Sequence, residues 1–107
     1  MRMVFLSFSE DQTDEVMEIL KSERIGDYVR WDEIKGQSSG YRPRMGTDVW
    51  PGHSGAVVFP LTEERIAVLC ETVEKFNREA EYEGISMFVW NIDCMVLKEP
   101  KKREPKQ

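Results

Sequence analysis

Residues 35–55, KGQSSGYRPRMGTDVWPGHSG, carry the side chains of this chain that are best suited to holding a small anion. The basic residues of this segment stand against a single carboxylate, Asp48, so the segment is locally positive in an acidic chain. Consecutive amide groups in glycine-rich turns form concave anion sites, and serine hydroxyls add further donors. We therefore predict an anionic small-molecule site at Lys35, Gly36, Ser38, Ser39, Arg42 and Arg44. A solvated loop with ordinary turn glycines has the same composition and stays open as the alternative.

The second half of this segment, MGTDVWPGHSG at 45–55, adds a tryptophan and the only histidine of the chain. An exposed indole is costly in water and a Trp-Pro pair is stiff, so we expect Trp50 to dock. It either anchors the loop on its own sheet or on a neighbouring subunit, or it stacks on a ligand ring. His53 can titrate near neutral pH, donate to an anion or ligate a metal. Without other ligands at metal-binding spacing, a hydrogen-bonded loop histidine is favoured over a metal ligand.

No residue pattern typical of catalysis occurs in the chain. The sequence lacks a nucleophile elbow, a glycine-rich phosphate motif that opens a helix, and a Ser/His/Asp set that one histidine could complete. Cys70 and Cys94 form no CxxC pair, so neither a disulfide framework nor a zinc site is indicated. We therefore expect a binding protein and not an enzyme.

The elements that must position the 35–55 segment follow from hydrophobic periodicity. The spacing of Ser9 and Gln12 predicts a capping box that opens the first helix, Thr62 should cap the second, and Gly84 should stop it. The predicted strands are 3–8, 28–35, 55–61 and 85–92, the predicted helices are 10–22 and 63–82, and a long loop fills 36–53. The order βαββαβ predicts an α+β, ferredoxin-like sandwich, in which a four-stranded antiparallel sheet carries two helices on one face.

The predicted strands are apolar on both faces, although helices on one side can cover only one of them. The first strand places Met3 and Phe5 on one side and Val4 and Leu6 on the other, and 85–92 alternates in the same way. A large open apolar patch is a liability for a monomer, because such surfaces drive association. We therefore expect a symmetric homo-oligomer whose sheets pack together.

Length and charge limit the remaining classes of function. The chain of 107 residues and 12.5 kDa fits one domain, 1–97, and a basic tail, 98–107, which we expect to be disordered. Of the formal net charge of -5, the tail contributes +3 and the body therefore -8. A body this acidic repels phosphate backbones, which argues against nucleic-acid binding. The chain has no apolar run long enough to insert into a membrane and no export pattern, so we expect a soluble, cytoplasmic protein.

Three stretches together resemble the PII-like superfamily of trimeric signalling proteins, and within it a small branch of short, poorly characterised members. They are DEVMEIL at 14–20, DEIKG at 32–36 and GISMFVWNID at 84–93, and the resemblance spans residues 1–96. It implies a homotrimer that binds a nucleotide or a related small metabolite in clefts between subunits. These clefts would be lined by the 36–53 loop and by the end of the last strand, where we add Trp90 to the predicted site. The loop would regulate a partner protein, such as a transporter or an enzyme.

The stretch before the last strand departs from the family pattern. It reads NREAEYEG at 77–84, which is acidic where the family has a basic, glycine-rich phosphate-binding stretch. We therefore leave the ligand open between a nucleotide and another small anionic metabolite. CutA proteins, which serve divalent-ion tolerance, share the architecture, so a metal-responsive role for His53 with Met45 or Asp48 is a second hypothesis. An oligomerisation module without a ligand is the third.

Overall fold

The structure is a computed structural model and describes residues 1–37 and 42–99. Its elements are β1 (Arg2–Ser9), η1 (Glu10–Gln12), α1 (Thr13–Ser22), β2 (Val29–Ile34), β3 (Ser54–Leu61), α2 (Glu63–Glu79) and β4 (Ser86–Asn91). The predicted order βαββαβ is therefore confirmed, with the first helix divided into a 3-10 turn and an α-helix. The tail predicted to be disordered is 98–107, of which residues 100–107 lie outside the described residues.

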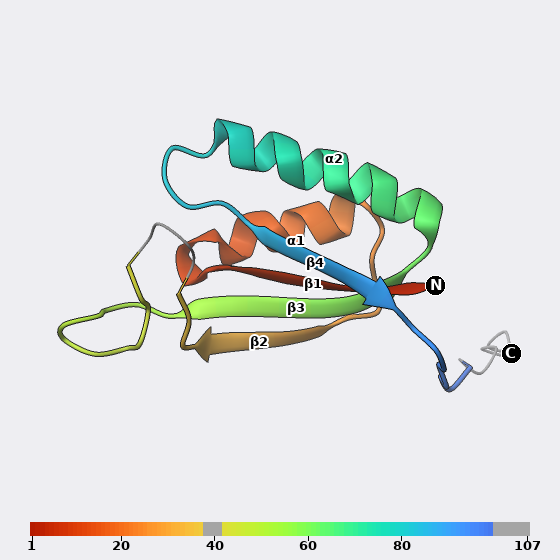
Figure 1. The fold of residues 1–107 in the computed structure, drawn as a ribbon, viewed down its shortest axis with the longest axis horizontal. Coiled ribbons are helices and arrows are strands. Elements are labelled where there is room, and N and C mark those ends of the chain that lie inside the picture. The colour runs from red at the N-terminus through yellow and green to blue at the C-terminus, as the bar shows by residue number, and fades with distance from the viewer. Residues whose placement is uncertain (38–41, 100–107) are drawn as a thin grey trace, which may run out of the picture.

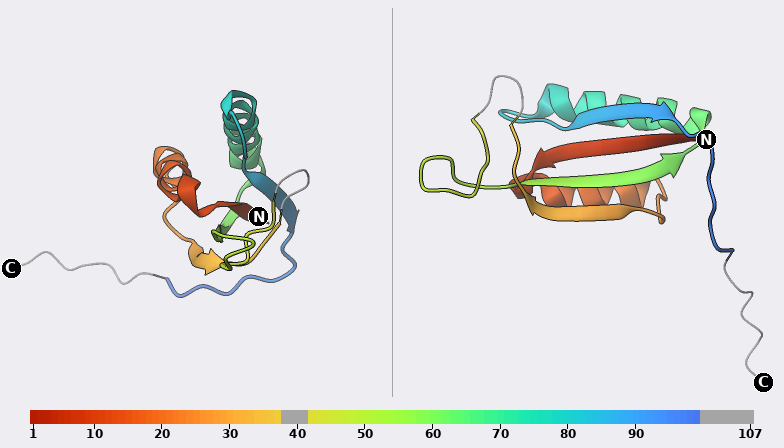
Figure 2. Two further views of the ribbon diagram at one scale, coloured as in Figure 1. Left: turned by 90° about the vertical axis from the view of Figure 1, so that its left-hand side faces the viewer. Right: turned by 60° about the horizontal axis from the view of Figure 1, so that its bottom comes forward.

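The strands form one antiparallel sheet in the order β2-β3-β1-β4. Both helices lie on the same face of this sheet, and no described element covers the other face (Figures 1 and 2). This is the predicted ferredoxin-like arrangement. No described helix is both long enough and apolar enough to cross a membrane.

The core lies between the sheet and the two helices. Alternate residues of β1 point into it, because side chains of a strand alternate between the two faces. Val4, Leu6 and Phe8 are accordingly almost fully buried. The core cluster consists of Val4, Leu6, Phe8, Val16, Leu20, Ile25, Val57, Phe59, Leu61, Ile66, Leu69, Val73 and Ile85.

The open face of the sheet, on the side away from the helices, carries apolar side chains in register. One row crosses all the strands at Val29, Val58, Phe5 and Phe88, and a second row holds Pro60, Met3 and Trp90. Val29 is 55%, Phe88 58% and Trp90 47% exposed. The rings of Phe5 and Phe88 lie 6.3 Å apart between centroids. The prediction that the strands are apolar on both faces is therefore confirmed.

The predicted capping box at Ser9 is wrong, whereas Thr62 is the N-cap residue of α2 as predicted. Ser9 makes no side-chain cap hydrogen bond, because the chain first forms η1 and Gln12 turns away from it. The Nε2 of Gln12 instead donates to the carbonyl oxygen of Glu83 at 2.5 Å. Thr62 occupies the position before α2 but also makes no side-chain cap hydrogen bond.

The helix α2 ends at Glu79, earlier than predicted, so Gly84 does not terminate it. The chain is turned back toward β4 by Asn77, whose Oδ1 accepts from the N–H of Ile85 at 2.7 Å. The Nδ2 of Asn77 donates to the carbonyl oxygen of Ile85 at 2.9 Å. A Cβ on Gly84 would overlap the side chain of Asn77. The glycine therefore makes room for this paired amide.

Candidate functional site

A backbone bridge closes the loop between β2 and β3. The N–H of Gly36 donates to the carbonyl oxygen of Arg44 at 2.8 Å, and the N–H of Arg44 donates to that of Gly36 at 2.6 Å. Glycine suits this position because a Cβ on Gly36 would lie 2.9 Å from Ser54 Oγ. The predicted site residues Ser38 and Ser39 lie outside the described residues. The bridge thus holds Gly36, at the start of the loop, next to Arg44, in its middle.

The side chain of Arg44 is only 10% exposed and is held at three points. Its Nε donates to Ser54 Oγ at 2.8 Å, and its Nη1 donates to both carboxylate oxygens of Glu83 at 2.6 Å. Ion pairs that are largely withdrawn from water are sensitive to the loss of either partner. Arg44 therefore ties the loop to β3 and to the connection between α2 and β4. An anionic ligand would have to share this guanidinium with Glu83.

The second half of the loop is a tight turn held by its backbone. The carbonyl oxygen of Trp50 accepts from the N–H groups of Met45 and Thr47, each at 3.1 Å, and its own N–H donates to Thr47 Oγ1 at 3.0 Å. Gly46 and Gly52 adopt φ values of +67° and +84°, which only glycine adopts without strain. The side chain of Trp50 remains partly exposed. Within one chain the loop thus positions Trp50 through its backbone and leaves its ring accessible.

His53 joins the end of this turn to η1. Its carbonyl oxygen accepts from the N–H of Glu10 at 3.0 Å, and its Nδ1 lies 3.5 Å from Glu10 Oε2. The ring lies against Gly46, where an added Cβ would stand 2.5 Å from Nε2. In the part of the chain that the structure describes, no three potential ligands gather into a metal site. His53 is therefore placed to hold the end of the loop against η1.

A cavity of about 870 Å³ opens beside this loop. Its walls come from η1 and the start of α1, from the middle and the end of the loop at 42–44 and 51–52, and from the end of α2 and its connection to β4, which meet at one end of the sheet (Figure 1). Of the predicted site residues, Arg42 and Arg44 line this cavity, whereas Lys35, Gly36, Trp50 and His53 do not. The remaining charged lining residues are carboxylates, none of which was predicted from the sequence to belong to a site. Three of them, Glu79, Glu81 and Glu83, belong to the acidic stretch at 77–84, which is the one sequence signal for this wall.

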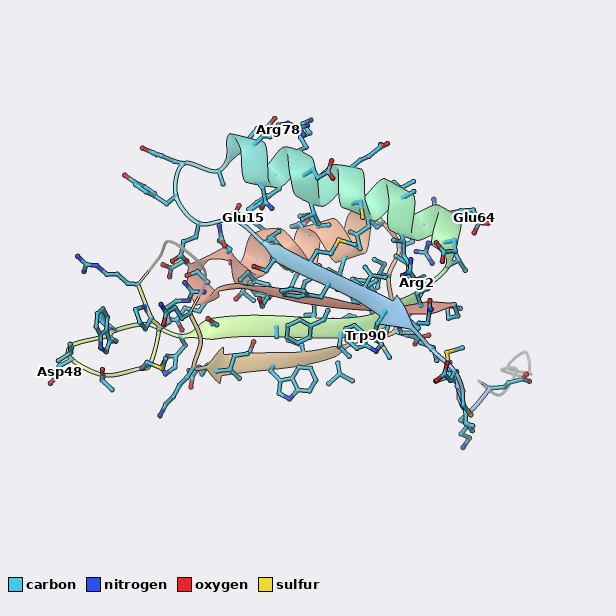
Figure 3. All side chains as sticks on the ribbon, in the orientation of Figure 1. Arg2, Glu15, Asp48, Glu64, Arg78 and Trp90 are labelled. Atoms are coloured by element: carbon cyan, nitrogen blue, oxygen red, sulfur yellow. The ribbon has the colours of Figure 1, made fainter. Side chains whose placement is uncertain are left out.

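Trp90 lies toward the other end of the sheet. It pairs with Met3, whereas the loop enters β3 beside Ser9. These two positions are six residues apart along the strand, a distance of roughly 20 Å. Figure 3 shows Trp90 and Asp48, at the tip of the loop, toward opposite ends of the molecule. A single chain therefore does not bring Trp90 together with the loop residues of the predicted site.

No protein-family model and no curated protein matches this sequence. Solved structures do match its fold. CPII from Thiomonas intermedia K12, described as bound to ADP and bicarbonate, superposes with a TM-score of 0.68 at 14% identity, covering 85% of this chain and 84% of that chain. Its apo form, described as a nitrogen regulatory PII-like protein, gives 0.64 at 12% identity, with coverages of 85% and 87%. A PII-like signaling protein from Thermus thermophilus gives 0.61 at 13% identity, with 85% of each chain covered. The fold of this chain is that of PII-like proteins.

Proposed function

We propose that this protein is a non-enzymatic, trimeric regulatory protein of the cytoplasm. It binds a small anionic metabolite or nucleotide in clefts between subunits. Ligand binding there changes the affinity of the 36–53 loop for a partner protein, which the loop regulates. The observation that carries the proposal is the open face of the sheet, whose apolar rows are covered by no described element.

Self-association would bury the apolar side chains of the open face, whose exposure to water is unfavourable. The side chains of Val29, Trp31, Phe88 and Trp90 are each close to half exposed or more in the single chain. Burial of apolar surface is worth about 25 cal/mol per Å², so a face of this kind supplies a strong drive to associate. A closed ring of identical chains covers every copy of the face at once and leaves no open end. The solved structures with this fold are described as PII-like regulatory or signaling proteins, which supports a regulatory role. The resemblance of the sequence to a superfamily of trimeric proteins is the reason to expect three copies.

The position of Trp90 supports a ligand site between subunits. The ring lies far from the loop of its own chain, so only a second copy can place it beside loop residues. Lys35 and Arg42 are both exposed and are the cations available to an anion, because Arg44 is held by Glu83. CPII is described as bound to ADP and bicarbonate, an organic phosphate and a small anion. Both are therefore the first ligands to test.

The anchoring of the loop supports its regulatory role. Residues 45–53 form a hydrogen-bonded turn, which Arg44 just before it and His53 at its end join to the rest of the chain. A ligand that binds one arrangement of this segment more tightly than another shifts the equilibrium toward that arrangement. The shift in free energy cannot exceed the difference between the two binding free energies. Trp50, with its exposed ring, then offers a surface that a partner protein can recognise.

The experiment compares ligand binding by the full chain and by Phe88→Glu, a substitution on the open face in the row that crosses all four strands. The charge should dissociate the trimer without entering the core, which circular dichroism checks. Isothermal titration with ADP and with bicarbonate should show binding to the wild-type chain and at least a tenfold loss in Phe88→Glu. At a ligand concentration a hundredfold above its dissociation constant, the wild type should gain about 2.7 kcal/mol of stability.

The matched control is Val68→Glu, which adds the same charge at an exposed position of α2 away from the open face. It should bind both ligands as the wild type does. Equal binding by a monomeric Phe88→Glu chain would place the ligand within one subunit and overturn the cleft. Absence of binding by the trimer would overturn the proposal for ADP and bicarbonate as its ligands.

A further inference from the structure

The cavity beside the loop is strongly acidic, although the loop itself was predicted to hold an anion. Its wall carries a formal net charge of -4, because six carboxylates stand against the guanidinium groups of Arg42 and Arg44. The carboxylates belong to Glu10, Asp11, Glu15, Glu79, Glu81 and Glu83. A wall of this sign favours a positively charged occupant.

Most of this negative charge is not neutralised within the chain. Glu83 pairs with Arg44, and Glu10 lies 3.5 Å from the ring of His53. Among the described residues no ion pair involves Asp11, Glu79 or Glu81, all of which are exposed. The wall also contains Gln12, whose Oε1 is buried and accepts no hydrogen bond from any described residue. The cavity thus offers several acceptors to a donor-rich, cationic group.

The spacing of the carboxylates indicates an extended occupant. They come from η1, α1, the end of α2 and the connection that follows it. In the described ranges no three of them converge closely enough to hold a metal ion. Charges spread along a wall match a chain of several basic side chains better than a single compact cation.

The sequence itself supplies such a segment. Residues 98–107, KEPKKREPKQ, hold five basic residues against two glutamates, while the rest of the chain carries -8. This tail follows β4, which leaves the sheet at the end opposite the cavity, and residues 92–99 run away from the body (Figure 2). From residue 92 to 107 an extended chain reaches about 55 Å, enough to span to a neighbouring molecule. We propose that the basic tail of one copy binds in the acidic cavity of a second copy.

The first experiment measures binding of the tail as a peptide. The receptor is the full-length chain with Lys101→Gln, Lys102→Gln and Arg103→Gln, so that its own tail does not compete. The probe is a fluorescently labelled peptide of residues 98–107, and the control peptide carries the same three glutamines. Fluorescence anisotropy at low salt should show at least tenfold tighter binding of the native peptide. Raising the salt to physiological strength should weaken it, because screening shortens the range of such contacts.

A second receptor locates the site. Adding Glu79→Gln and Glu81→Gln removes two exposed carboxylates of the cavity wall and leaves the Arg44–Glu83 pair intact. Peptide affinity should fall about five- to tenfold, as expected for the loss of two exposed charge contacts. The matched control is Glu64→Gln with Glu71→Gln, which removes the same charge from exposed positions of α2 outside the cavity. Equal affinities of both receptors, or of both peptides, would refute the proposal.

Carbodiimide cross-linking of the full-length chain tests whether the contact joins two copies. Copies with a neutral tail and copies with the Glu79→Gln, Glu81→Gln cavity are co-expressed with different tags. Mass spectrometry should find lysines of the intact tail linked to cavity carboxylates of the other tagged chain. Links found only within one chain would contradict docking on a second copy. These outcomes do not depend on whether ADP or bicarbonate binds, so this proposal and the proposed function fail separately.

Discussion

The Nη1 of Arg44 lies 2.6 Å from both carboxylate oxygens of Glu83, a residue 39 positions further along the chain. This contact joins the loop after β2 to the connection before β4, two segments that the sheet brings to the same end of the molecule. It also occupies the guanidinium group that we predicted from the sequence to bind an anionic ligand. The pair therefore fixes the architecture of this end of the fold and changes which cations remain available for binding.

Replacing Arg44 by alanine should destabilise the chain by about 2 kcal/mol, because Glu83 would keep a partly buried charge without its partner. Ser54 Oγ would lose a donor in the same step. Chemical denaturation measures the change. Arg42→Ala is the control, since Arg42 is exposed, and it should stay within about 0.5 kcal/mol of the wild type. Equal effects of the two substitutions would show that the ion pair contributes little.

Gly84→Ala should cost about 1–3 kcal/mol, because the added Cβ overlaps the side chain of Asn77. Asn77→Ala should cost about 2 kcal/mol through the loss of two hydrogen bonds to Ile85. Thermal or chemical unfolding of the single and double variants forms a double-mutant cycle. The double variant should be more stable than the sum of the single effects predicts, since the clash needs both side chains. Strict additivity would mean that the two positions do not meet.

Gly52→Ala should destabilise the turn that holds Trp50, because Gly52 has φ of +84° and alanine reaches that region only with strain. We expect a loss of about 1–2 kcal/mol. Gly26→Ala is the matched control: no atom lies within 4 Å of the place that its Cβ would take, and Gly26 is not among the positive-φ residues. That variant should be neutral or slightly stabilising. A neutral Gly52→Ala would argue against the turn.

Trp31→Glu places a charge on the open face at β2, where the tryptophan is half exposed. In a trimer whose sheets pack together, this charge would be buried without a partner, which weakens association by at least about a hundredfold. Analytical ultracentrifugation over a concentration series measures the shift. Val68→Glu introduces the same negative charge on α2, outside the open face, and should sediment as the wild type does. Identical behaviour of the two variants would remove the open face from the interface.

The sequence predicted the fold well because its signals are periodic and repeated. Alternation in MVFLSF at 3–8 and the three-and-four spacing of 63–79 each recur over several residues, so an error at one position does not change the assignment. The same alternation revealed that both faces of the sheet are apolar. Element ends were less well predicted, because they depend on contacts far away in the sequence. The connection after α2, for example, depends on the pairing of Asn77 with Ile85, eight positions further along the chain.

The site was harder to predict for the same reason. Arg42, Arg44 and the turn residues were correctly placed in one loop, but the partner of Arg44 comes from a different segment. Nothing local in NREAEYEG shows that Glu83 meets that arginine while Glu79 and Glu81 face an open cavity. Trp90 was grouped with the loop although the strand register puts it toward the other end of the sheet. Only a neighbouring subunit can unite them, and a single sequence does not show that contact.

The mass of the full-length protein in solution tests the central claim most directly. Light scattering or sedimentation equilibrium should give three times the chain mass of 12.5 kDa at the concentrations used for ligand binding. That result follows if the rows at Val29, Phe5, Phe88 and Trp90 are covered by other copies. A folded particle with the mass of one chain would contradict the account.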